Sequence, residues 1–377
     1  MKPAIEGSEG NPVLAGLRLV HRLVGLTVSL WLLLLGATGA LLVFKDDWLH
    51  LTQPVTAGPS PDAQAATPSG LARRARAAEF AFGADRIWAL VLAGPSIALD
   101  QVYLRDHAGG GYLDPQTGAV VARWDGAERV VDVLFDLHHA LMLGDAGKKA
   151  VGIVGLLGAM LVLSGLVLAW PTLRRLHGSV WPKSTTRSGL VVAHRELGLI
   201  AALPLLGIML TGAAVIFPAT ARVLLGGDSK LSIAARTPAT SSGSSDTAWQ
   251  AVFSAALARF PEATPRAITW PKAPDTAIAV RLRQPIEWHP NGRTTVLATA
   301  AGYVVDTRDA AAAPLPDRLV NAAYPVHAGK VGGLLYRSLV ALAGLALALL
   351  SSYSAIAYAR HLFGGLGQRK ARPASRG

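Results

Sequence analysis

The chain has 377 residues, of which 51% are hydrophobic and 16% are charged, and its mean hydropathy is +0.37. This composition excludes an ordinary soluble domain, in which about 25% of residues are charged, and directs attention to membrane spans. The formal net charge of +12 does not require nucleic acid as a partner, because much of the basic excess lies in segments beside the spans.

Four stretches are apolar and free of charge: residues 23–44, 150–173, 197–221 and 338–359, with lengths of 22, 24, 25 and 22 residues. At about 1.5 Å per residue, each crosses a hydrocarbon layer of about 30 Å, where only a helix satisfies its own backbone. The first stretch exceeds the apolar core of a cleaved signal peptide, which has about 7–15 residues. The sequence therefore predicts four transmembrane helices.

Basic residues indicate the orientation of these helices. Residues 171–195 and 360–377 contain several arginines and lysines and no acidic residue. The positive-inside rule places both segments, together with the N-terminus, in the cytoplasm. We therefore expect a multi-pass protein of a bacterial inner membrane, with residues 45–149 and 218–337 in the periplasm.

The two halves of the chain repeat each other. At an offset of 173 residues and without a gap, the sequence around the first span recurs around the third: His21, Arg22, Gly25, Leu26, Thr38, Gly39, Ala40 and Phe44 recur as His194, Arg195, Gly198, Leu199, Thr211, Gly212, Ala213 and Phe217. The second and fourth spans correspond more loosely, each preceded by a histidine and a glycine-rich tract. Two spans per half predict parallel repeats related by an axis along the membrane normal.

Each periplasmic segment reads as a short helix followed by alternating strands. In the first segment, Asp114 to Gly118 (DPQTG) is typical of a turn between two strands. Residues 56–70 and 237–247 are rich in Ser, Thr, Ala and Pro, which is typical of linkers. We predict two small α+β modules, one after each odd-numbered span.

Several of these motifs resemble the PepSY-associated transmembrane family. They are LHHALMLGDAGKK before a helix that contains SGLVLAWP, the openings HRLVGL, HRELGL and PVHAGKVGG, and the turn YLDPQTGAVV. The resemblance covers nearly the whole chain and is most specific at the helix openings. Some members of that family are inner-membrane reductases of ferric siderophores that bind haem b, and others have no assigned activity.

The resulting fold class is a mainly α membrane protein with two small PepSY-like α+β modules. The predicted organisation is residues 1–45, cytoplasmic N-terminus and first helix; 46–132, first module; 133–173, second helix with its histidine-containing opening; 174–193, basic loop; 194–221, third helix; 222–320, second module; 321–360, fourth helix with its opening; and 361–377, basic tail.

Histidines near the ends of the spans suggest two haem b groups per chain, each held by two imidazoles. His21 would pair with His194 toward the cytoplasm, and His138 with His327 toward the periplasm. A single histidine beside an arginine at a helix end is ordinarily an interfacial residue, but its repetition with a second matched pair favours ligation of haem iron. His139 competes with His138 for one coordination position.

The rest of the composition limits the cofactor. Without cysteine, covalent haem attachment, thiolate-ligated haem, cysteine-ligated iron–sulfur clusters and disulfides are excluded. Arg22 and Arg195 each follow a candidate ligand and could meet haem propionates through charge-assisted hydrogen bonds. No carboxylate or nucleophile is indicated as a catalytic residue.

The sequence has no P-loop, no G-x-G-x-x-G after a strand, no H-E-x-x-H and no G-x-S-x-G, so an electron donor must be external, a quinol or a flavoprotein. The expected function is a ferric-siderophore reductase, an oxidoreductase that releases Fe(II) from an Fe(III) chelate in the periplasm. Arg281, Arg283, Trp270 and Trp288 are candidates for contacting the chelate. The alternative is a haem-free sensing or regulatory membrane protein whose modules bind a partner.

Overall fold

The structure is a computed structural model that describes residues 11–53, 67–126, 128–175, 178–228, 245–270, 277–299 and 301–370. The chain divides into two compact units. The membrane unit comprises Met1–Val43, Asp136–Ile216 and Gly332–Gly377, and the outer unit comprises Phe44–Phe135 and Phe217–Val331. This division follows the predicted alternation of spans and large hydrophilic segments.

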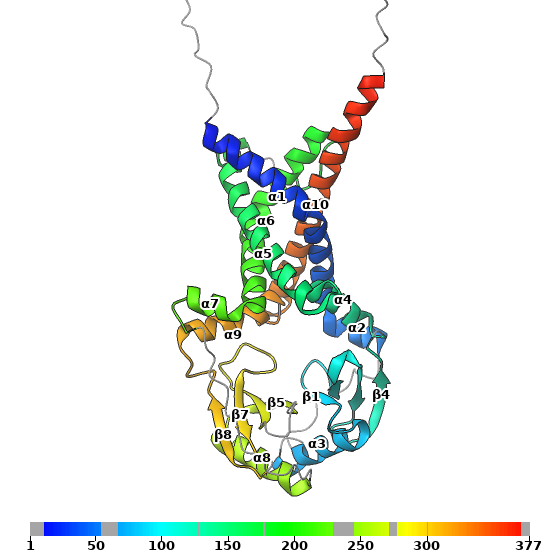
Figure 1. The fold of residues 1–377 in the computed structure, drawn as a ribbon, viewed down its shortest axis with the longest axis vertical. Helices are drawn as coiled ribbons and strands as arrows, with labels where there is room; N and C mark the ends of the chain where they lie inside the picture. Colours follow the sequence, from blue (N-terminus) through cyan, green and yellow to red (C-terminus); the bar gives the residue numbers. More distant parts are fainter. Residues whose placement is uncertain are drawn as a thin grey trace, which may run out of the picture. The chain divides into compact units, whose positions relative to one another are not determined.

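Four long helices form the membrane unit: α1 (Pro12–Leu42), α5 (Gly144–Ala169), α6 (Arg187–Ile216) and α10 (Gly333–Lys370). Each contains a stretch long and apolar enough to cross a membrane. Helix α1 packs against α10 and α5, and α6 packs against the same two neighbours, so α1 and α6 are diagonal in the bundle (Figure 1). The four predicted transmembrane helices are confirmed.

The helix ends differ from the predicted ones. Helix α1 begins at Pro12, 11 residues before the charge-free stretch, because its backbone continues as a helix through Arg18 and Arg22. Helix α6 ends at Ile216 instead of residue 221, since the proline at 218 disfavours the α conformation at the residue before it. Hydrophobicity predicts where a helix is buried in lipid, whereas capping and proline determine where it ends.

The outer unit contains one eight-stranded antiparallel sheet. Its strands are β1 (Ile87–Val91), β2 (Asp100–Leu104), β3 (Gly110–Leu113), β4 (Val120–Trp124), β5 (Thr264–Thr269), β6 (Ile278–Arg283), β7 (Thr294–Ala298) and β8 (Val304–Arg308), in the order β4-β3-β2-β1-β5-β6-β7-β8. Residues 44–135 and 217–331 each supply four of these strands. The segments do not form two separate sheets, because β1 and β5 pair at the centre, with Leu90 opposite Ile268.

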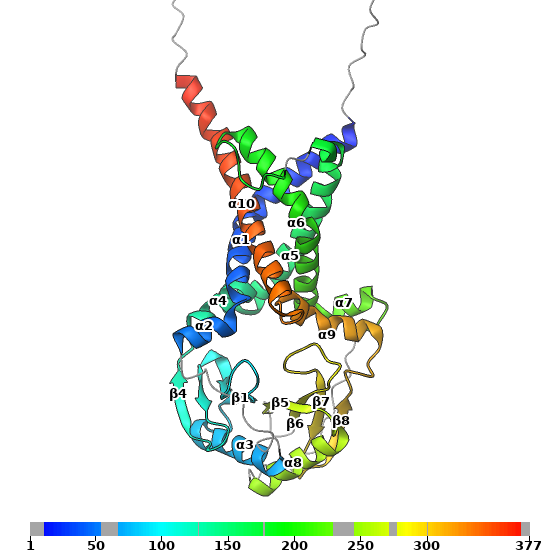
Figure 2. The same ribbon diagram turned by 180° about the vertical axis from the view of Figure 1, so that it is seen from behind.

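Two helices cover one face of this sheet (Figures 1 and 2). Helices α3 (Pro68–Phe82) and α8 (Asp246–Arg259) pack against each other, and their apolar residues share one hydrophobic core with both halves of the sheet. Inward residues alternate with residues on the opposite face, as in a half-buried strand. In β6, for example, Val280 and Leu282 are buried against α8, and Arg281 between them lies on the other face.

The predicted turn is present between β3 and β4. The Asp114 carboxylate accepts hydrogen bonds from the backbone N–H groups of Gln116 and Thr117, each at 2.8 Å, and Gly118 has φ +74°. Those backbone hydrogen bonds lower the pKa of Asp114. The two predicted linkers lie mostly outside the described residues, and their last residues instead begin α3 and α8, with Thr67 and Ser245 as N-caps.

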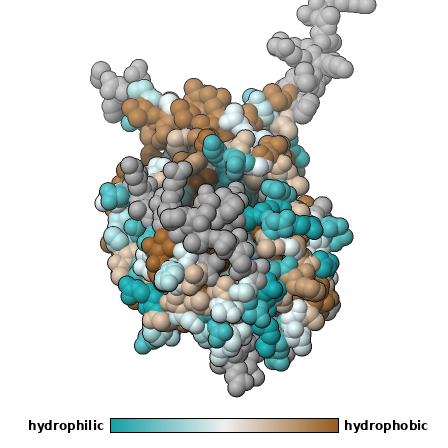
Figure 3. Space-filling model, turned by 60° about the horizontal axis from the view of Figure 1, so that its bottom comes forward, coloured by the Kyte–Doolittle hydropathy of each residue, from teal (hydrophilic) through white to brown (hydrophobic). Residues whose placement is uncertain are grey.

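Short helices next to the spans were not predicted. They are α2 (Lys45–Thr52), α4 (Val130–Ala140), α7 (Pro218–Leu224) and α9 (Leu315–His327), and a short 3₁₀ helix, η4 (Trp170–Arg175), follows α5. Helices of 7–13 residues contain too few turns for their hydrophobic periodicity to distinguish them from loops. On the face drawn in Figure 3, the surface of the outer unit is mixed, with hydrophilic residues next to smaller hydrophobic patches.

Candidate functional site

The two histidines of the repeat meet inside the membrane unit. His21 of α1 and His194 of α6 have ring centroids 6.5 Å apart, with their ring planes at 84°. Helices α1 and α6 are diagonal in the bundle, so the two imidazoles reach toward each other across its interior. The predicted pairing of these two residues agrees with this geometry.

His194 is held in one tautomer. Its Nδ1 lies 3.0 Å from the backbone carbonyl oxygen of Leu350 and 3.2 Å from the hydroxyl of Ser354, both on α10. A carbonyl oxygen only accepts hydrogen bonds, so Nδ1 carries the proton and donates it. The lone pair of His194 is therefore on Nε2, the nitrogen that remains for a metal ion.

His21 is held in the same way by α5. Its Nδ1 lies 2.8 Å from the hydroxyl of Ser164, and that hydroxyl donates its own proton to the carbonyl oxygen of Leu161 at 3.1 Å. Ser164 must therefore accept from His21, which again leaves the lone pair on Nε2. Each imidazole has a serine neighbour on the helix beside it, Ser164 for His21 and Ser354 for His194. Neither serine was predicted from the sequence, although a lone polar residue in an apolar helix can indicate an interhelical hydrogen bond.

The distance between the rings suits one metal ion between them. A ring nitrogen binds a transition metal at about 2 Å, and the ring centroid is about 1 Å farther, so two imidazoles on opposite sides of one ion have centroids about 6 Å apart. In the described part of the chain, no group of three or more His, Asp or Glu side chains is placed to hold a metal. Two imidazoles without further protein ligands fit a haem iron, whose remaining four ligands are porphyrin nitrogens.

Arg195 and Glu196, the two residues that follow His194, form an ion pair with each other. Glu196 is fully buried, and its carboxylate accepts a hydrogen bond from the backbone N–H of Ser179 at 2.8 Å and lies 3.3 Å from Arg195 Nη2. Arg195 Nε is buried and has no acceptor among the described residues. Such a donor would fit an anionic group such as the expected propionate. Arg22 is exposed, so its predicted contact with a propionate has no comparable support.

His138 lies against the other end of α1. Its Nδ1 is 3.1 Å from the hydroxyl of Thr38, which itself donates to the carbonyl oxygen of Leu34 at 2.7 Å. His138 therefore donates from Nδ1, as His21 and His194 do. Gly39 makes room for this ring, because a Cβ there would lie 2.9 Å from His138 Cε1.

His139 and His327 complete the set of predicted ligands. His139 follows His138 in α4 and is partly buried; burial, and then Lys148, lower its pKa. His327 is the last residue of α9 and belongs to the outer unit, whereas His138 belongs to the membrane unit. The pairing of His138 with His327 stays a prediction.

The residues predicted to contact a chelate are separated in the outer unit. Trp270 is 6% exposed in the core and donates its indole N–H to Glu79 at 3.1 Å, so its proposed contact is wrong. Trp288 is exposed, whereas Arg281 is partly buried on the sheet face opposite α8. An alternation of buried and exposed residues predicts which face a side chain occupies but not which helix covers that face.

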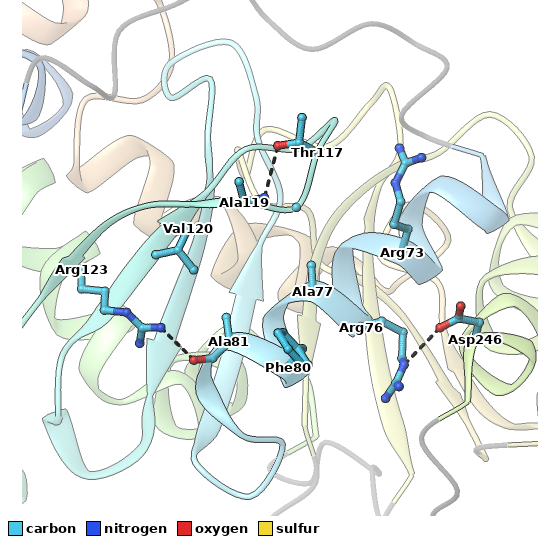
Figure 4. Close-up of a pocket in the computed structure, with 11 residues that line it drawn as sticks. Arg73, Arg76, Ala77, Phe80, Ala81, Thr117, Ala119, Val120, Arg123 and Asp246 are labelled. Atoms are coloured by element: carbon cyan, nitrogen blue, oxygen red, sulfur yellow. Dashed lines mark hydrogen bonds and ion pairs between the residues drawn. The ribbon is translucent and has the colours of Figure 1, made fainter.

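An open depression on the outer unit is lined by α3, α8, strand β4 and the loop between β3 and β4 (Figure 4). Arg76 pairs with Asp246 at 3.1 Å, Arg123 donates to the carbonyl oxygen of Ala81 at 2.9 Å, and Phe80 is 96% exposed. These charged groups have partners and are near solvent, so they do not indicate a ligand.

Comparison with known proteins agrees with the architecture. No curated protein matches the chain. The family described as the PepSY-associated TM region matches residues 18–360, which include the second and third spans, most of the first and fourth, and both halves of the sheet. The match also contains every histidine of the site. The chain belongs to the PepSY-associated transmembrane family.

Proposed function

We propose that this protein is a haem b-dependent reductase of the bacterial inner membrane, which passes electrons to a ferric siderophore or another Fe(III) chelate in the periplasm. The observation that carries the proposal is the pair His21 and His194, with centroids 6.5 Å apart and both Nδ1 protons donated to neighbouring helices. Hydrogen bonds of this kind fix the orientation of a metal-ligating imidazole and raise its basicity.

Bound between these imidazoles, a haem b would supply one-electron chemistry by alternating between its ferric and ferrous states. His21 and His194 would hold the iron, while Ser164 and the Leu350 carbonyl keep each ring in the required tautomer. The buried Nε of Arg195 provides a donor for a propionate. His138, with His139 as the competing residue, and His327 are the proposed ligands of a second haem.

The reaction needs no acid or base from the protein. One electron, supplied by a quinol or a cytoplasmic flavoprotein, converts Fe(III) in the chelate to Fe(II). Fe(II) carries less charge and binds the hard oxygen ligands of a siderophore more weakly, so the metal is released and the ligand is unchanged.

The decisive experiment is the optical spectrum of protein purified from haem-replete cells. We expect a Soret band and reducible α and β bands corresponding to two haems per chain. His21→Ala and His194→Ala should each remove about half of this absorbance, whereas His361→Ala, an exposed histidine of α10, should remove none. Anaerobic mixing of the reduced protein with ferric siderophores should then reoxidise the haem.

A colourless preparation would contradict the proposal and leave the alternative, a haem-free membrane protein that senses or restrains a periplasmic partner. If the protein contains haem but no Fe(III) chelate reoxidises it, the proposed cofactor would stand and Fe(III) chelates would be excluded as substrates.

A further inference from the structure

The face of β6, β7 and β8 that points away from α8 carries a row of polar residues. Arg281, Thr295 and Arg308 occupy directly paired positions on these three strands. Because neighbouring strands are about 4.8 Å apart, the backbones of the two arginines lie about 10 Å apart. The side chains of Arg281 and Arg308 are therefore long enough to contact the same small ligand.

Other elements of the outer unit bring more groups to this face. Arg222 comes from α7, and Arg293 from the loop between β6 and β7. Helix α9 presents Asp317, Asn321 and Tyr324 at positions i, i+4 and i+7, which lie on one helix face. Ion pairs join these elements, since Asp317 Oδ1 lies 3.6 Å from Arg222 Nη1 and 3.9 Å from Arg308 Nη2.

Three carboxylates accompany the four arginines of this face and offset only part of their charge. Asp317 is shared between Arg222 and Arg308. Glu287 accepts hydrogen bonds from the backbone N–H groups of Gln284 and Thr294 and from the Thr294 hydroxyl. Asp306, also on β8, accepts from the backbone N–H of Thr307 at 2.8 Å.

Arg281 and Arg293 have no ion pair within the described residues. Burial, followed by repulsion from Arg281 and Arg308, lowers the pKa of Arg293 to about 10. The cluster therefore holds more positive charge than its surroundings compensate.

Unpartnered donors give independent evidence. Among the described residues, six buried side-chain nitrogen atoms lack a hydrogen-bond partner, and three of them belong to this cluster: Arg222 Nε, Arg293 Nε and Asn321 Nδ2. All three donate, so an acceptor would satisfy them, whereas a cation would not. Native proteins rarely leave such groups without a partner.

We propose that these residues form a binding site for a small oxyanion, a carboxylate or a phosphate. Oxygens of the anion accept hydrogen bonds from Arg281, Arg293 and Asn321, and its charge offsets the surplus of guanidinium groups. The site is independent of haem, so it stands or falls separately from the reductase function.

Binding is tested by calorimetric titration of the full-length protein in detergent, at constant ionic strength set with sodium chloride. The probes are inorganic phosphate, citrate and dihexanoyl phosphatidylglycerol, with the phosphatidylcholine analogue as a neutral control. We expect saturable binding of at least one anionic probe. Response to phosphate or citrate identifies a free anion, and response only to phosphatidylglycerol identifies a lipid headgroup.

Arg281→Gln and Arg293→Gln should each raise the Kd of that probe about tenfold or more. Arg318→Gln removes the same charge from the exposed side of α9 and should leave the Kd unchanged. Without anion, the two cluster variants should have a Tm equal to or above that of the parent, because like-charge repulsion is relieved.

The absence of saturable binding for every probe would overturn the proposal. So would an equal loss of affinity in Arg318→Gln, or a lower anion-free Tm in both cluster variants, because that result would make the arginines structural.

Discussion

At the scale of single residues, the site formed by His21 and His194 depends on hydrogen bonds that neither a charged residue nor a sequence motif indicates. Ser164 is the clearest case, since it fixes the proton of His21 and contributes nothing else polar to that ring. Removing an outer partner of a metal-binding histidine typically lowers metal affinity by about 10–100-fold.

We therefore expect Ser164→Ala to retain less haem than the parent after dilution or washing, if haem binds as proposed. The measurement is the ratio of Soret absorbance to protein. Ser352→Ala is a matched control, because its hydroxyl donates only to Ala348 of its own helix. Equal haem retention in both variants would show that Ser164 does not position His21.

Two aspartate–arginine pairs in the outer unit allow a test of how burial changes the contribution of an ion pair to stability. Asp100 is fully buried, accepts from Arg74 Nε at 2.6 Å and also accepts from the backbone N–H of Ala93. Asp246 pairs with Arg76 but its side chain is 82% exposed.

We expect Asp100→Asn to lower the free energy of unfolding by about 3–5 kcal/mol, because Arg74 stays buried without its counter-charge. Asp246→Asn should cost less than about 1 kcal/mol, since solvent screens the exposed pair. Chemical denaturation followed by tryptophan fluorescence measures both. Similar losses of unfolding free energy in the two variants would show that burial does not determine how much each ion pair contributes to stability.

His289 should make the outer unit sensitive to acid. Its ring is 6% exposed and lies 5.0 Å from the Tyr324 ring. Burial, and then the nearby Arg293, Arg281 and Arg283, lower its pKa to about 2 from the ordinary 6.5.

Below pH 6.5 the unfolded chain takes up a proton at His289 that the folded protein does not. The free energy of unfolding should therefore fall as pH decreases from 6.5 toward 2, by up to about 1.4 kcal/mol per pH unit from this group. His289→Gln should flatten this part of the stability curve, and His361→Gln should not. An unchanged slope in His289→Gln would assign the acid sensitivity to other groups.

At the scale of elements, glycines set the distance between α1 and α10. A Cβ on Gly36 would lie 2.7 Å from the Gly344 carbonyl oxygen and 2.9 Å from the Ala348 nitrogen. These backbone atoms cannot move aside as a flexible side chain would, so the helices are packed as closely as a glycine allows.

Gly36→Ala should therefore destabilise the membrane unit by about 1–3 kcal/mol through overpacking. Gly207→Ala has no atom within 4 Å of the added Cβ and should be neutral or slightly stabilising. Thermal unfolding in detergent compares the two. A loss in both would indicate that helix packing at Gly36 is not the cause.

The sequence predicts some elements better than others for physical reasons. The four spans are predictable because lipid leaves the backbone no alternative to a helix. The proximity of His21 and His194 was predictable because the two residues occupy the same position in the repeated sequence. The serines beside them, the short helices and the β1–β5 pairing depend on contacts between distant segments, which no local pattern encodes.

At the scale of the whole molecule, the absence of cysteine makes the predicted orientation directly testable. Gln116 and Thr185 are both exposed, one on the outer unit and one in the loop between α5 and α6. We expect a membrane-impermeant maleimide to label Gln116→Cys in spheroplasts, and Thr185→Cys only after the membrane is permeabilised. The reverse pattern would invert the topology.

The central pairing of the sheet also constrains how the protein is made. Strand β1 hydrogen-bonds to a partner almost 180 residues later in the chain, and two spans are inserted between them. Until α6 has been inserted and β5 has been synthesised, β1 presents an unprotected edge. Unpaired edge strands can pair with strands of other molecules, so a chain whose synthesis stops before β5 would be an aggregation-prone half.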